Sequence, residues 1–501
     1  MFFSRGGGIG RRTRFRTWRW QQHRGSNPLS GIDIIVLKKI VIAGLLIYAI
    51  FYLFNSFIII TYPYQISYPE GFILNHIRSI IKGESIYKSI NDYPFIVVNY
   101  PPVYLYLCAG LAKLTGLSFF GGRLITFIAS IFVALLIYEI TKKESDKEVA
   151  FISALLFIAS SYIYKNNPLM RVDMLGLLFS LLGIYIFIKA DAQNKPFYSI
   201  PLFILSLYTK PVFFSAPVAA GIWLIIKDKK RGFTFILLSI ISYGIIFFFL
   251  NHLTNGEFFR HNFLYNLNIF ILTQAIKHYV WFLQNHSMLF FFSVFFIIDS
   301  LIKRELSIFS VYFIISAITS FSAGKIGANT NYFLELIAIS CILSGLCIKK
   351  LKGYNQKKIC NLLIYTLLFI QLLLFLHMPF LTKPAPTKSD RENFEKLSDI
   401  ISKTEGPIIS EDGGILVLNK KEVLFMPFEF TQLANQKIWN QDKFLEDLKN
   451  KRFSLLVFSF NVNYFFDKER LTPEIVKVMK DNYYVDKAIG DYFIYKPISN
   501  Q

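Results

Sequence analysis

Long apolar runs separated by short polar stretches dominate the chain between residues 40 and 380. An apolar run of about 20 residues is long enough to cross the hydrocarbon core of a bilayer as a helix. The pattern therefore predicts a polytopic α-helical membrane protein with about 11–13 spans. The candidate spans are residues 40–62, 120–141, 148–165, 172–190, 197–209, 211–227, 232–250, 286–302, 306–322, 331–348 and 359–380.

Two segments leave the topology open. In the arrangement that we prefer, residues 101–118 lie at the outer surface without crossing, and residues 197–227 cross twice as two short halves. In the rival arrangement, 101–118 crosses the membrane and 197–227 forms one long helix. Both arrangements place the loop 251–285 and the region 381–501 on the outer face.

The hydrophilic region 381–501 has the pattern of a small α/β domain. Helical periodicity alternates with short strand-like runs, and Gly413-Gly414 and Pro427 lie between them. The predicted helices are 391–404, 442–451 and 472–481, and the predicted strands are 407–410, 422–426, 453–460 and 491–496. Dinucleotide-binding loops, P-loops and paired metal motifs are not found in this region of the sequence.

The composition excludes a soluble enzyme. The 501 residues are 53% hydrophobic and 17% charged, whereas a soluble domain of this size carries about 25% charged residues. The formal charge of +21 does not indicate nucleic-acid binding, because residues 383–501 contain 18 Lys/Arg and 18 Asp/Glu and are therefore neutral. The excess lies in the N-terminal tail and in short loops, which is how positive charge is distributed in membrane proteins.

The charge of the loops predicts the orientation in the membrane. With the N-terminus inside, the tail and the inner loops carry 25 Lys/Arg, and the outer loops and re-entrant pieces carry about ten. We therefore expect a plasma (inner) membrane protein with a cytoplasmic N-terminus and an extracytoplasmic C-terminal domain. The expected parts are a basic tail (1–39), a membrane domain (40–380) with outer loops 63–119 and 251–285, and an outer domain (381–501).

The first thirty residues differ from the rest in composition, with seven Arg and no Lys. The stretch GRRTRFRTWRW resembles a translated transfer-RNA gene. The alternatives are a misplaced start codon and a basic cytoplasmic tail. A cleavable signal peptide is not indicated, because no cleavage site with small residues follows an apolar stretch there.

The first outer loop is long, polar and aromatic. Glu70 follows the first span closely, and an amphipathic helical pattern over 72–81 could lie in the membrane interface. Tyr100-Pro101-Pro102 then turns the chain back toward the membrane. A carboxylate at this position could take a proton from an incoming hydroxyl, although a Glu in a loop is more often simply solvated.

Several motifs together resemble the GT-C superfamily of membrane glycosyltransferases. The resemblance is greatest to the bacterial protein-mannosyltransferase-like and aminoarabinose-transferase-like members, of the glycosyltransferase family 39 type, and it covers nearly the whole chain after residue 40. The motifs are the acidic position at Glu70 with its helix, Tyr-Pro-Pro (100–102), Arg-x-Asp (171–173), Thr-Lys-Pro (209–211), Asn-Tyr-Phe-Leu-Glu (331–335) and the outer C-terminal domain.

The resemblance implies that Glu70 is the catalytic base. The family often has Asp-Glu at this position, whereas this chain has Pro69-Glu70 and so keeps one carboxylate. Asp92 is the second candidate base. Asp173 could orient Arg171 or act as a second acid.

A phosphate that departs as a leaving group needs cations nearby to stabilise its negative charge. Nucleotide sugars are absent from the outer face, so a sugar donor there is linked to a lipid, and a departing polyprenyl phosphate needs positive charge nearby. The basic residues predicted to bind it are Lys88, Arg171, Lys210 and Lys325. Each of these could instead snorkel to lipid headgroups.

Four further residues are predicted to contact substrate: Tyr100, Asn331, Tyr332 and Glu335. Glu335 is notable because an ionisable group inside an apolar span is costly unless it serves a site or has a partner. Lys325 is a possible partner, since both lie toward the outer face.

We expect no dedicated metal site and no required cofactor, although a divalent cation remains compatible with the sequence. His252, His261, His278 and His286 lie in or beside the outer loop 251–285, but their spacing matches no common ligand motif. The expected partners are a polyprenyl-phosphate sugar donor, a lipid, glycan or protein acceptor, and membrane lipids, but not nucleic acid.

The leading functional hypothesis is an inverting glycosyltransferase that transfers a hexose or pentose to an acceptor hydroxyl on the outer face. The alternative is a flippase or transporter of lipid-linked sugars. A transporter would favour internal repeats and charges near the bilayer centre, whereas the ionisable residues here concentrate at the outer rim. The sequence does not identify the sugar, the acceptor or the prenyl lipid.

Overall fold

The computed structural model describes residues 32–353, 357–376 and 385–499. Seven helices in these ranges are long and apolar enough to cross a membrane, and three shorter apolar helices accompany them. The seven are α1 (Ile32–Thr61), α4 (Phe119–Glu144), α7 (Asp173–Asp191), α10 (Lys229–Leu253), α12 (Leu272–Ile302), α14 (Leu334–Lys352) and α15 (Lys357–Leu376). The shorter segments of the bundle are α5 (Lys147–Ala159), α6 (Ser161–Asn166), η1 (Pro196–Ser199) with α8 (Ile200–Leu207), α9 (Ser215–Lys227) and α13 (Ile308–Ser320).

The predicted fold class is confirmed, because each of the predicted spans corresponds to one helix or to a pair of consecutive helices. By length alone, however, fewer helices qualify as full spans than the 11–13 that were expected, since several segments are short. The N-terminal segment 1–31 and the end of the last predicted span (377–380) lie outside the described residues.

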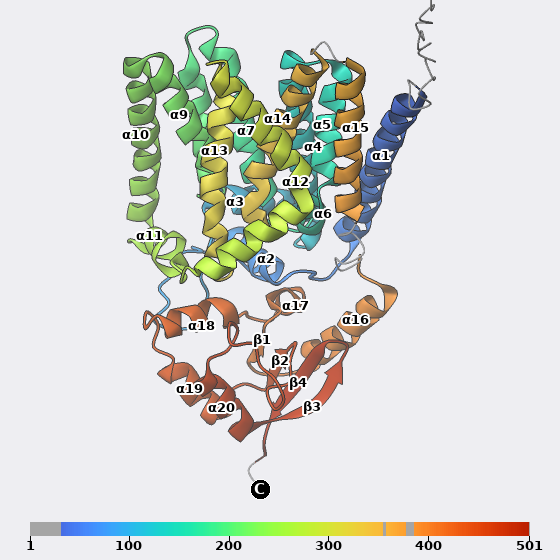
Figure 1. Ribbon diagram of the computed structural model, residues 1–501. Coiled ribbons are helices and arrows are strands. Elements are labelled where there is room, and N and C mark those ends of the chain that lie inside the picture. Colours follow the sequence, from blue (N-terminus) through green and yellow to red (C-terminus); the bar gives the residue numbers. More distant parts are fainter. Residues whose placement is uncertain (1–31, 354–356, 377–384, 500–501) are drawn as a thin grey trace, which may run out of the picture.

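The helices form one bundle, and the C-terminal domain lies against one end of it (Figure 1). The N-terminal end of α1 is at the opposite end. We call the two ends the domain side and the opposite side. Of the seven candidate spans in the described residues, α14 is the most enclosed, and almost all of its residues are buried among the other helices.

The chain between α7 and α10 runs through the bundle and back. Asp191, at the end of α7, pairs with Lys227 at 3.1 Å and with Arg231 at 3.0 Å on the opposite side. Lys210, between α8 and α9, instead reaches Asp173 at the start of α7 on the domain side. This course agrees with the two short halves that we predicted for residues 197–227.

Helix α3 (Pro102–Thr115) begins and ends on the domain side. At its start, the Val103 N–H donates to the Tyr208 carbonyl at 3.2 Å. Just after its end, the Phe119 ring lies against Gly414 of the C-terminal domain. Residues 101–118 therefore do not cross the bundle, as the preferred topology requires.

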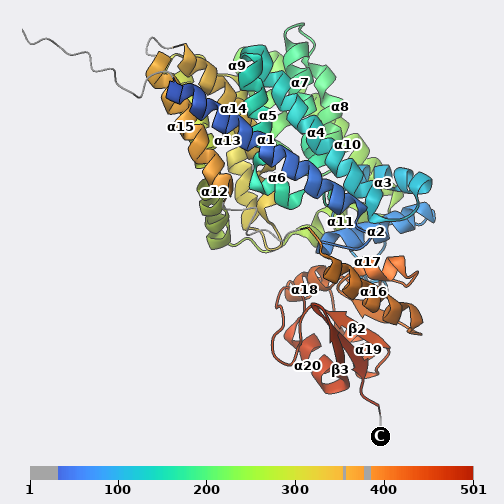
Figure 2. The same ribbon diagram turned by 90° about the vertical axis from the view of Figure 1, so that its right-hand side faces the viewer.

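Helix α2 (Tyr68–Ile81) lies between the bundle and the C-terminal domain (Figure 2). It packs against α3 on one side and against α17 on the other. The remaining connections on the domain side are α11 (Glu257–Asn262), η2 (Leu264–Asn266), η3 (Phe321–Gly324) and η4 (Thr330–Phe333).

The C-terminal domain has a four-stranded sheet of order β1-β2-β4-β3, in which β1 and β2 are parallel and the other pairs are antiparallel. Its elements are α16 (Lys388–Lys403), β1 (Ile408–Ser410), α17 (Gly413–Leu418), α18 (Pro427–Asn435), α19 (Asp442–Lys449), β2 (Leu455–Phe458), α20 (Pro473–Asn482), β3 (Tyr483–Ile489) and β4 (Tyr492–Pro497). The three predicted helices and three of the predicted strands are present.

The predicted strand 422–426 is not part of this sheet. Its backbone pairs instead with Phe95 of the first loop: Phe95 N–H donates to the Leu424 carbonyl at 2.9 Å, and Met426 N–H donates to the Phe95 carbonyl at 3.0 Å. The extended run therefore satisfies its hydrogen bonds across the boundary between the two parts of the molecule. Strand β3 was not among the predicted strands.

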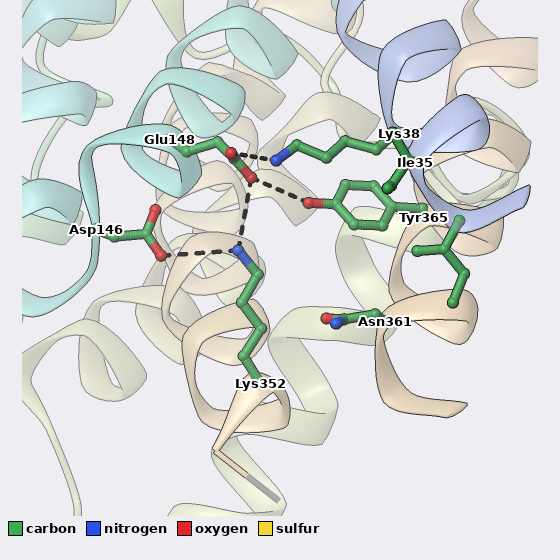
Figure 3. Close-up of a pocket in the computed structure, with 8 residues that line it drawn as sticks. Ile35, Lys38, Asp146, Glu148, Lys352, Asn361 and Tyr365 are labelled. Carbon is green, nitrogen blue, oxygen red and sulfur yellow. Dashed lines mark hydrogen bonds and ion pairs between the residues drawn. The ribbon is translucent and has the colours of Figure 1, made fainter. Parts of the chain in front are cut away.

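A charged cavity of about 440 Å³ lies on the opposite side. Lys38 of α1 and Lys352 of α14 face Asp146 and Glu148, and Tyr365 donates to Glu148 at 3.0 Å (Figure 3). These charges balance each other and lie far from the polar residues on the domain side. They link the ends of three helices.

Candidate active site

Six predicted site residues converge on the domain side of the bundle, and we call them the boundary cluster: Tyr100, Arg171, Asp173, Lys210, Asn331 and Tyr332. Asp173 is the centre of this cluster. Its Oδ1 accepts from Lys210 Nζ at 2.5 Å and from Asn331 Nδ2 at 2.8 Å, while its Oδ2 accepts from Arg171 Nε at 3.2 Å. The Arg-x-Asp, Thr-Lys-Pro and Asn-Tyr motifs, far apart in the sequence, therefore build one site.

The cluster has more positive than negative charge, because two cations share one carboxylate. Lys210 is nearly buried and lies over the Tyr332 ring, with its Nζ 4.8 Å from the ring centroid. The Arg171 side chain is 17% exposed, and the Asp173 carboxylate raises its pKa even though burial opposes this. An anion that approached the cluster would meet a guanidinium held in place and always charged.

Tyr100 joins the cluster from the first loop. Burial raises the pKa of its hydroxyl, and the nearby charges of Arg171 and Asp173 also influence that pKa. A phenol in this environment stays protonated and can donate a hydrogen bond to a ligand.

Glu70 is not available as a catalytic base in this structure, contrary to our expectation. Its side chain is 0% exposed and forms a bidentate pair with Arg123 of α4, with both N–O distances 2.9 Å. Backbone N–H groups of Met170, Ile66 and Ser67 also donate to the carboxylate at 2.7, 2.9 and 3.2 Å. A carboxylate has about four lone-pair positions, so five donors leave none for an incoming hydroxyl.

The charge state of Glu70 leads to the same conclusion. Burial would raise its pKa, but the Arg123 guanidinium and the backbone N–H groups outweigh burial and lower it. A stabilised carboxylate of this kind is a weak proton acceptor. Glu70 instead fixes the backbone of Met170, and Thr126 donates to the Arg171 carbonyl at 3.1 Å. The loop that carries Arg171 is thus held from both sides.

The second candidate base and one predicted cation lie outside the cluster. The Asp92 side chain is 71% exposed and pairs with Lys443 of α19 at 2.5 Å. The Lys88 side chain is half exposed and pairs with Glu84 at 3.1 Å. Both residues belong to the surface of the loop, and no contact connects either one to Asp173 in the described structure.

Lys325 lies at the margin of the cluster. Its Nζ donates to Asn266 Oδ1 at 3.1 Å, and burial, together with the positive charge of Lys210, lowers its pKa to about 8. The Glu335–Lys325 pair that we considered does not form. Glu335 points into the bundle, where Ser180 and Tyr312 hydroxyls donate to its Oε1 at 2.6 and 2.8 Å.

Two of these histidines, His261 and His286, have structural contacts. His261 Nδ1 accepts from the Val98 N–H at 2.9 Å and its Nε2 lies 2.7 Å from the Lys88 carbonyl, which fits a neutral ring that holds the first loop. Buried His286 contacts Ser160 at 2.7 Å. Within the described residues, no three His, Cys, Asp or Glu side chains are grouped so as to hold a metal ion. Metal independence therefore stays a prediction.

The C-terminal domain contributes a carboxylate that is not among the predicted site residues, although it lies in the segment 428–432 that follows a predicted strand. Glu429, in the first turn of α18, accepts from Tyr68 Oη at 3.0 Å and from Asn99 Nδ2 at 2.9 Å. Asn99 directly precedes Tyr100, so Glu429 lies beside the boundary cluster. The sequence showed Glu429 after a strand-like run, but only the fold shows that this run pairs with the first loop.

A second contact joins the domain to the first loop. Gln65 donates to Asp412 and accepts from the Gly414 N–H at 3.0 Å, and Tyr492 also donates to Asp412. Burial raises the pKa of Asp412 to about 7. The two segments that follow predicted strands, 410–414 and 428–432, therefore both meet the first loop rather than open solvent.

Comparison with known proteins defines the class to which this architecture belongs. The fold matches ArnT from Cupriavidus metallidurans, solved with bound undecaprenyl phosphate, with a TM-score of 0.60, 12% identity and coverage of 91% of this chain and 98% of that chain. It also matches the archaeal oligosaccharyltransferase AglB from Archaeoglobus fulgidus, solved with an inhibitory peptide and a dolichol-phosphate, with a TM-score of 0.52, 12% identity and coverage of 90% and 74%. The chain has the GT-C fold of membrane glycosyltransferases.

The sequence matches are shorter. Residues 99–254 match the family model described as dolichyl-phosphate-mannose-protein mannosyltransferase. An uncharacterized protein of Aquifex aeolicus (strain VF5) is 26% identical over 197 residues, which is 34% of this chain and 46% of that relative. The chain thus spans less than half of the length of this relative. Together with the fold, these matches confirm the resemblance to the GT-C superfamily.

Proposed function

We propose that this protein is an inverting glycosyltransferase that transfers a sugar from a polyprenyl-phosphate-linked donor to an acceptor hydroxyl. The observation that supports this most directly is the convergence of Arg171 and Lys210 on one carboxylate at the domain side of a GT-C fold. The two similar structures were solved with undecaprenyl phosphate and with dolichol-phosphate bound. The positive charge of the boundary cluster favours an anionic ligand such as a lipid phosphate.

The chemistry of the leaving group explains the arrangement. When the bond between the anomeric carbon and the phosphate oxygen breaks, negative charge grows on that oxygen. Arg171 can donate through its remaining N–H groups, and Lys210 adds a fixed positive charge. Asp173 holds both cations in position before the donor arrives. Tyr100, Tyr332 and Asn331 supply the polar and aromatic surface that a sugar ring needs.

In this proposal the domain side is the extracytoplasmic side. Two features support that orientation: the basic loops gather on the opposite side, and lipid-linked donors replace nucleotide sugars outside the cytoplasm. The N-terminus would then be cytoplasmic and the protein would reside in the plasma membrane. The sugar and the acceptor stay unassigned, because fold similarity does not carry substrate identity.

The test uses the purified full-length protein in detergent, where transport across a bilayer is impossible. Binding of undecaprenyl phosphate would be measured for the wild type and for Arg171→Gln and Lys210→Met. A charge-assisted hydrogen bond contributes about 1.5–3 kcal/mol, so each variant should bind about 10–100-fold more weakly. Lys88→Gln is the matched control, since Lys88 is on the same side of the protein but outside the cluster.

Transfer of radiolabelled sugar from undecaprenyl-phosphate hexoses and pentoses to alkyl glycosides and a Ser/Thr-containing peptide would be measured in parallel. The same variants should lose transfer, and Lys88→Gln should keep it. Equal binding of undecaprenyl phosphate by all four proteins would refute the assignment of the cluster. Wild-type protein that binds this lipid but never releases it from a sugar donor would favour the transporter hypothesis instead.

A further inference from the structure

Glu429 is a carboxylate beside the boundary cluster that keeps room for a ligand. It receives side-chain donors from Tyr68 and Asn99, one on each oxygen, so each oxygen retains a lone-pair position. Its side chain is partly exposed. Glu70 differs on both counts, because it is fully buried and accepts from five donors.

Adjacent residues place Glu429 next to the cations. Asn99 donates to Glu429, and the next residue, Tyr100, lies among the charges of the boundary cluster. The hydroxyl of Tyr100 is close enough to Arg171, Asp173 and Glu429 that each of them influences its pKa. A sugar bound with its phosphate at Arg171 would therefore have Glu429 on the side that faces the C-terminal domain.

Two buried amide oxygens beside these groups also point to a ligand with hydroxyl groups. Asn99 and Asn331 each donate their NH₂ group to a carboxylate, which fixes the orientation of the amides. Among the described residues, neither Asn99 Oδ1 nor Asn331 Oδ1 has a hydrogen-bond partner, and both atoms are buried. Buried acceptors without donors are rare and costly. Sugar hydroxyls are donors that would satisfy them.

We propose that Glu429 of the C-terminal domain is the catalytic base of the transfer, an inference that rests on the proposed function. The acceptor hydroxyl gives its proton to a Glu429 Oε atom, and its oxygen forms a bond to the anomeric carbon. The bond from that carbon to the phosphate oxygen breaks with inversion, and its electron pair leaves on the polyprenyl phosphate beside Arg171 and Lys210. The membrane domain thus binds the leaving group, and the C-terminal domain activates the acceptor.

The titration behaviour of Glu429 suits a base. Burial raises its pKa to about 7, against hydrogen bonds from Tyr68 and Asn99 and the positive charge of Arg470, which lower it. A base with this pKa is ionised in about half of the molecules at neutral pH and accepts a proton readily. Arg470 lies over the Tyr68 ring, 3.8 Å from its centroid, so the groups that face Glu429 come from α2, the first loop and the C-terminal domain.

The experiment compares Glu429→Gln with the matched control Glu469→Gln, a carboxylate of the same domain that lies next to Arg470 in the sequence. Full-length proteins are assayed for sugar transfer from undecaprenyl-phosphate donors and for binding of undecaprenyl phosphate. General base catalysis contributes 10²–10⁴-fold, so Glu429→Gln should lower kcat by at least about 100-fold. Binding of undecaprenyl phosphate should stay at the wild-type level, and Glu469→Gln should keep wild-type kcat.

The pH profile provides a second readout. The wild type should lose activity below about pH 7 as Glu429 is protonated, and this acid limb should vanish in the residual activity of Glu429→Gln. Tyr68→Phe keeps the carboxylate but removes a hydrogen bond that lowers its pKa, so the limb should move to higher pH. That variant decides the question if Glu429→Gln fails to fold.

The outcomes separate the two levels of the proposal. Wild-type kcat with an unchanged acid limb in Glu429→Gln, or an unmoved limb in Tyr68→Phe, would overturn the role of Glu429 and leave the glycosyltransferase proposal intact. Wild-type protein that transfers no sugar from any of the lipid donors would overturn both.

Discussion

The pair formed by Glu70 and Arg123 gives the sharpest test of how the site is built. Both side chains are 0% exposed. Beyond Glu70, the Arg123 guanidinium donates to the carbonyls of Ile59, Tyr62 and Tyr64 at 2.9, 2.6 and 2.7 Å. Glu70→Gln removes the negative charge and leaves this guanidinium buried without a counterion. The side chain keeps nearly the same volume, so packing is not the variable.

The expected loss of stability is large. Removing one partner of a buried ion pair typically costs 3–5 kcal/mol, because the remaining charge is not compensated. The Gln amide also replaces one acceptor oxygen with a donor, which then faces the N–H groups that Glu70 accepted. We therefore expect Glu70→Gln to lower the melting temperature by several degrees. Glu84→Gln, which removes an exposed partner on the same loop, should change it little.

The assay is thermal unfolding of the full-length protein in detergent, followed together with sugar transfer. A positioning role predicts that stability and transfer fall together and that the acid limb near pH 7 remains. A catalytic role predicts an unchanged melting temperature, a transfer rate near zero and loss of the acid limb. The second result would refute our assignment of Glu70 and restore the expectation drawn from sequence.

Two further predictions concern the contact between α2 and the C-terminal domain. A Cβ atom on Gly71 would come within 1.9 Å of Gln65 Oε1 and 2.3 Å of a backbone nitrogen of α17, so Gly71→Ala should destabilise the protein by about 1–3 kcal/mol. The control is Gly110→Ala, because a Cβ atom on Gly110 meets nothing within 4 Å. Equal melting temperatures of the two variants would contradict the close contact at Gly71. Burial raises the pKa of Asp412 from 3.8 to about 7. Between these two pH values the folded protein binds one more proton at Asp412 than the unfolded chain does. The free energy of unfolding should therefore fall by roughly 4 kcal/mol as the pH rises from 4 to 7. Melting temperatures measured at pH 5 and pH 8 test this prediction. The change of melting temperature with pH should be smaller in Asp412→Asn. If the melting temperature of the wild type does not fall between pH 5 and pH 8, Asp412 is ionised at both pH values.

Much of the architecture follows from hydrophobic pattern alone. Loop charge also decides how the chain runs through 101–118 and 197–227: Lys227 and Arg231 lie on the opposite side, and Lys210 lies on the domain side. The exceptions are extended runs whose partners are remote. Residues 422–426 form a strand-like apolar run, but their partner is Phe95, some 330 positions earlier. The hydrophobic pattern of a short stretch of sequence does not show which distant segment it pairs with.

The site was partly predictable for a related reason. Arg171, Asp173 and Lys210 stood out because they lie in motifs at the outer rim of the membrane domain, where a departing phosphate would need cations, and the fold shows that they are each other's partners. Glu70 stood out through the resemblance to the GT-C superfamily, but its partner Arg123 lies inside an apolar span and was not considered. Glu429 is one acidic residue among 18 in residues 383–501, so only its contacts with Tyr68 and Asn99 distinguish it.

The dipeptide Asn99-Tyr100 explains why the two parts of the molecule have to meet in this way. Asn99 holds the carboxylate of the C-terminal domain, and Tyr100 lies among the cations of the bundle. A lipid donor fixes its phosphate at the depth of the membrane interface, so the groups that receive the leaving charge must belong to the membrane helices. An acceptor arrives from the aqueous side, so in our proposal the group that deprotonates it belongs to the C-terminal domain. In the same proposal, the surface of that domain can change with the acceptor while Arg171 and Lys210 bind the same lipid phosphate.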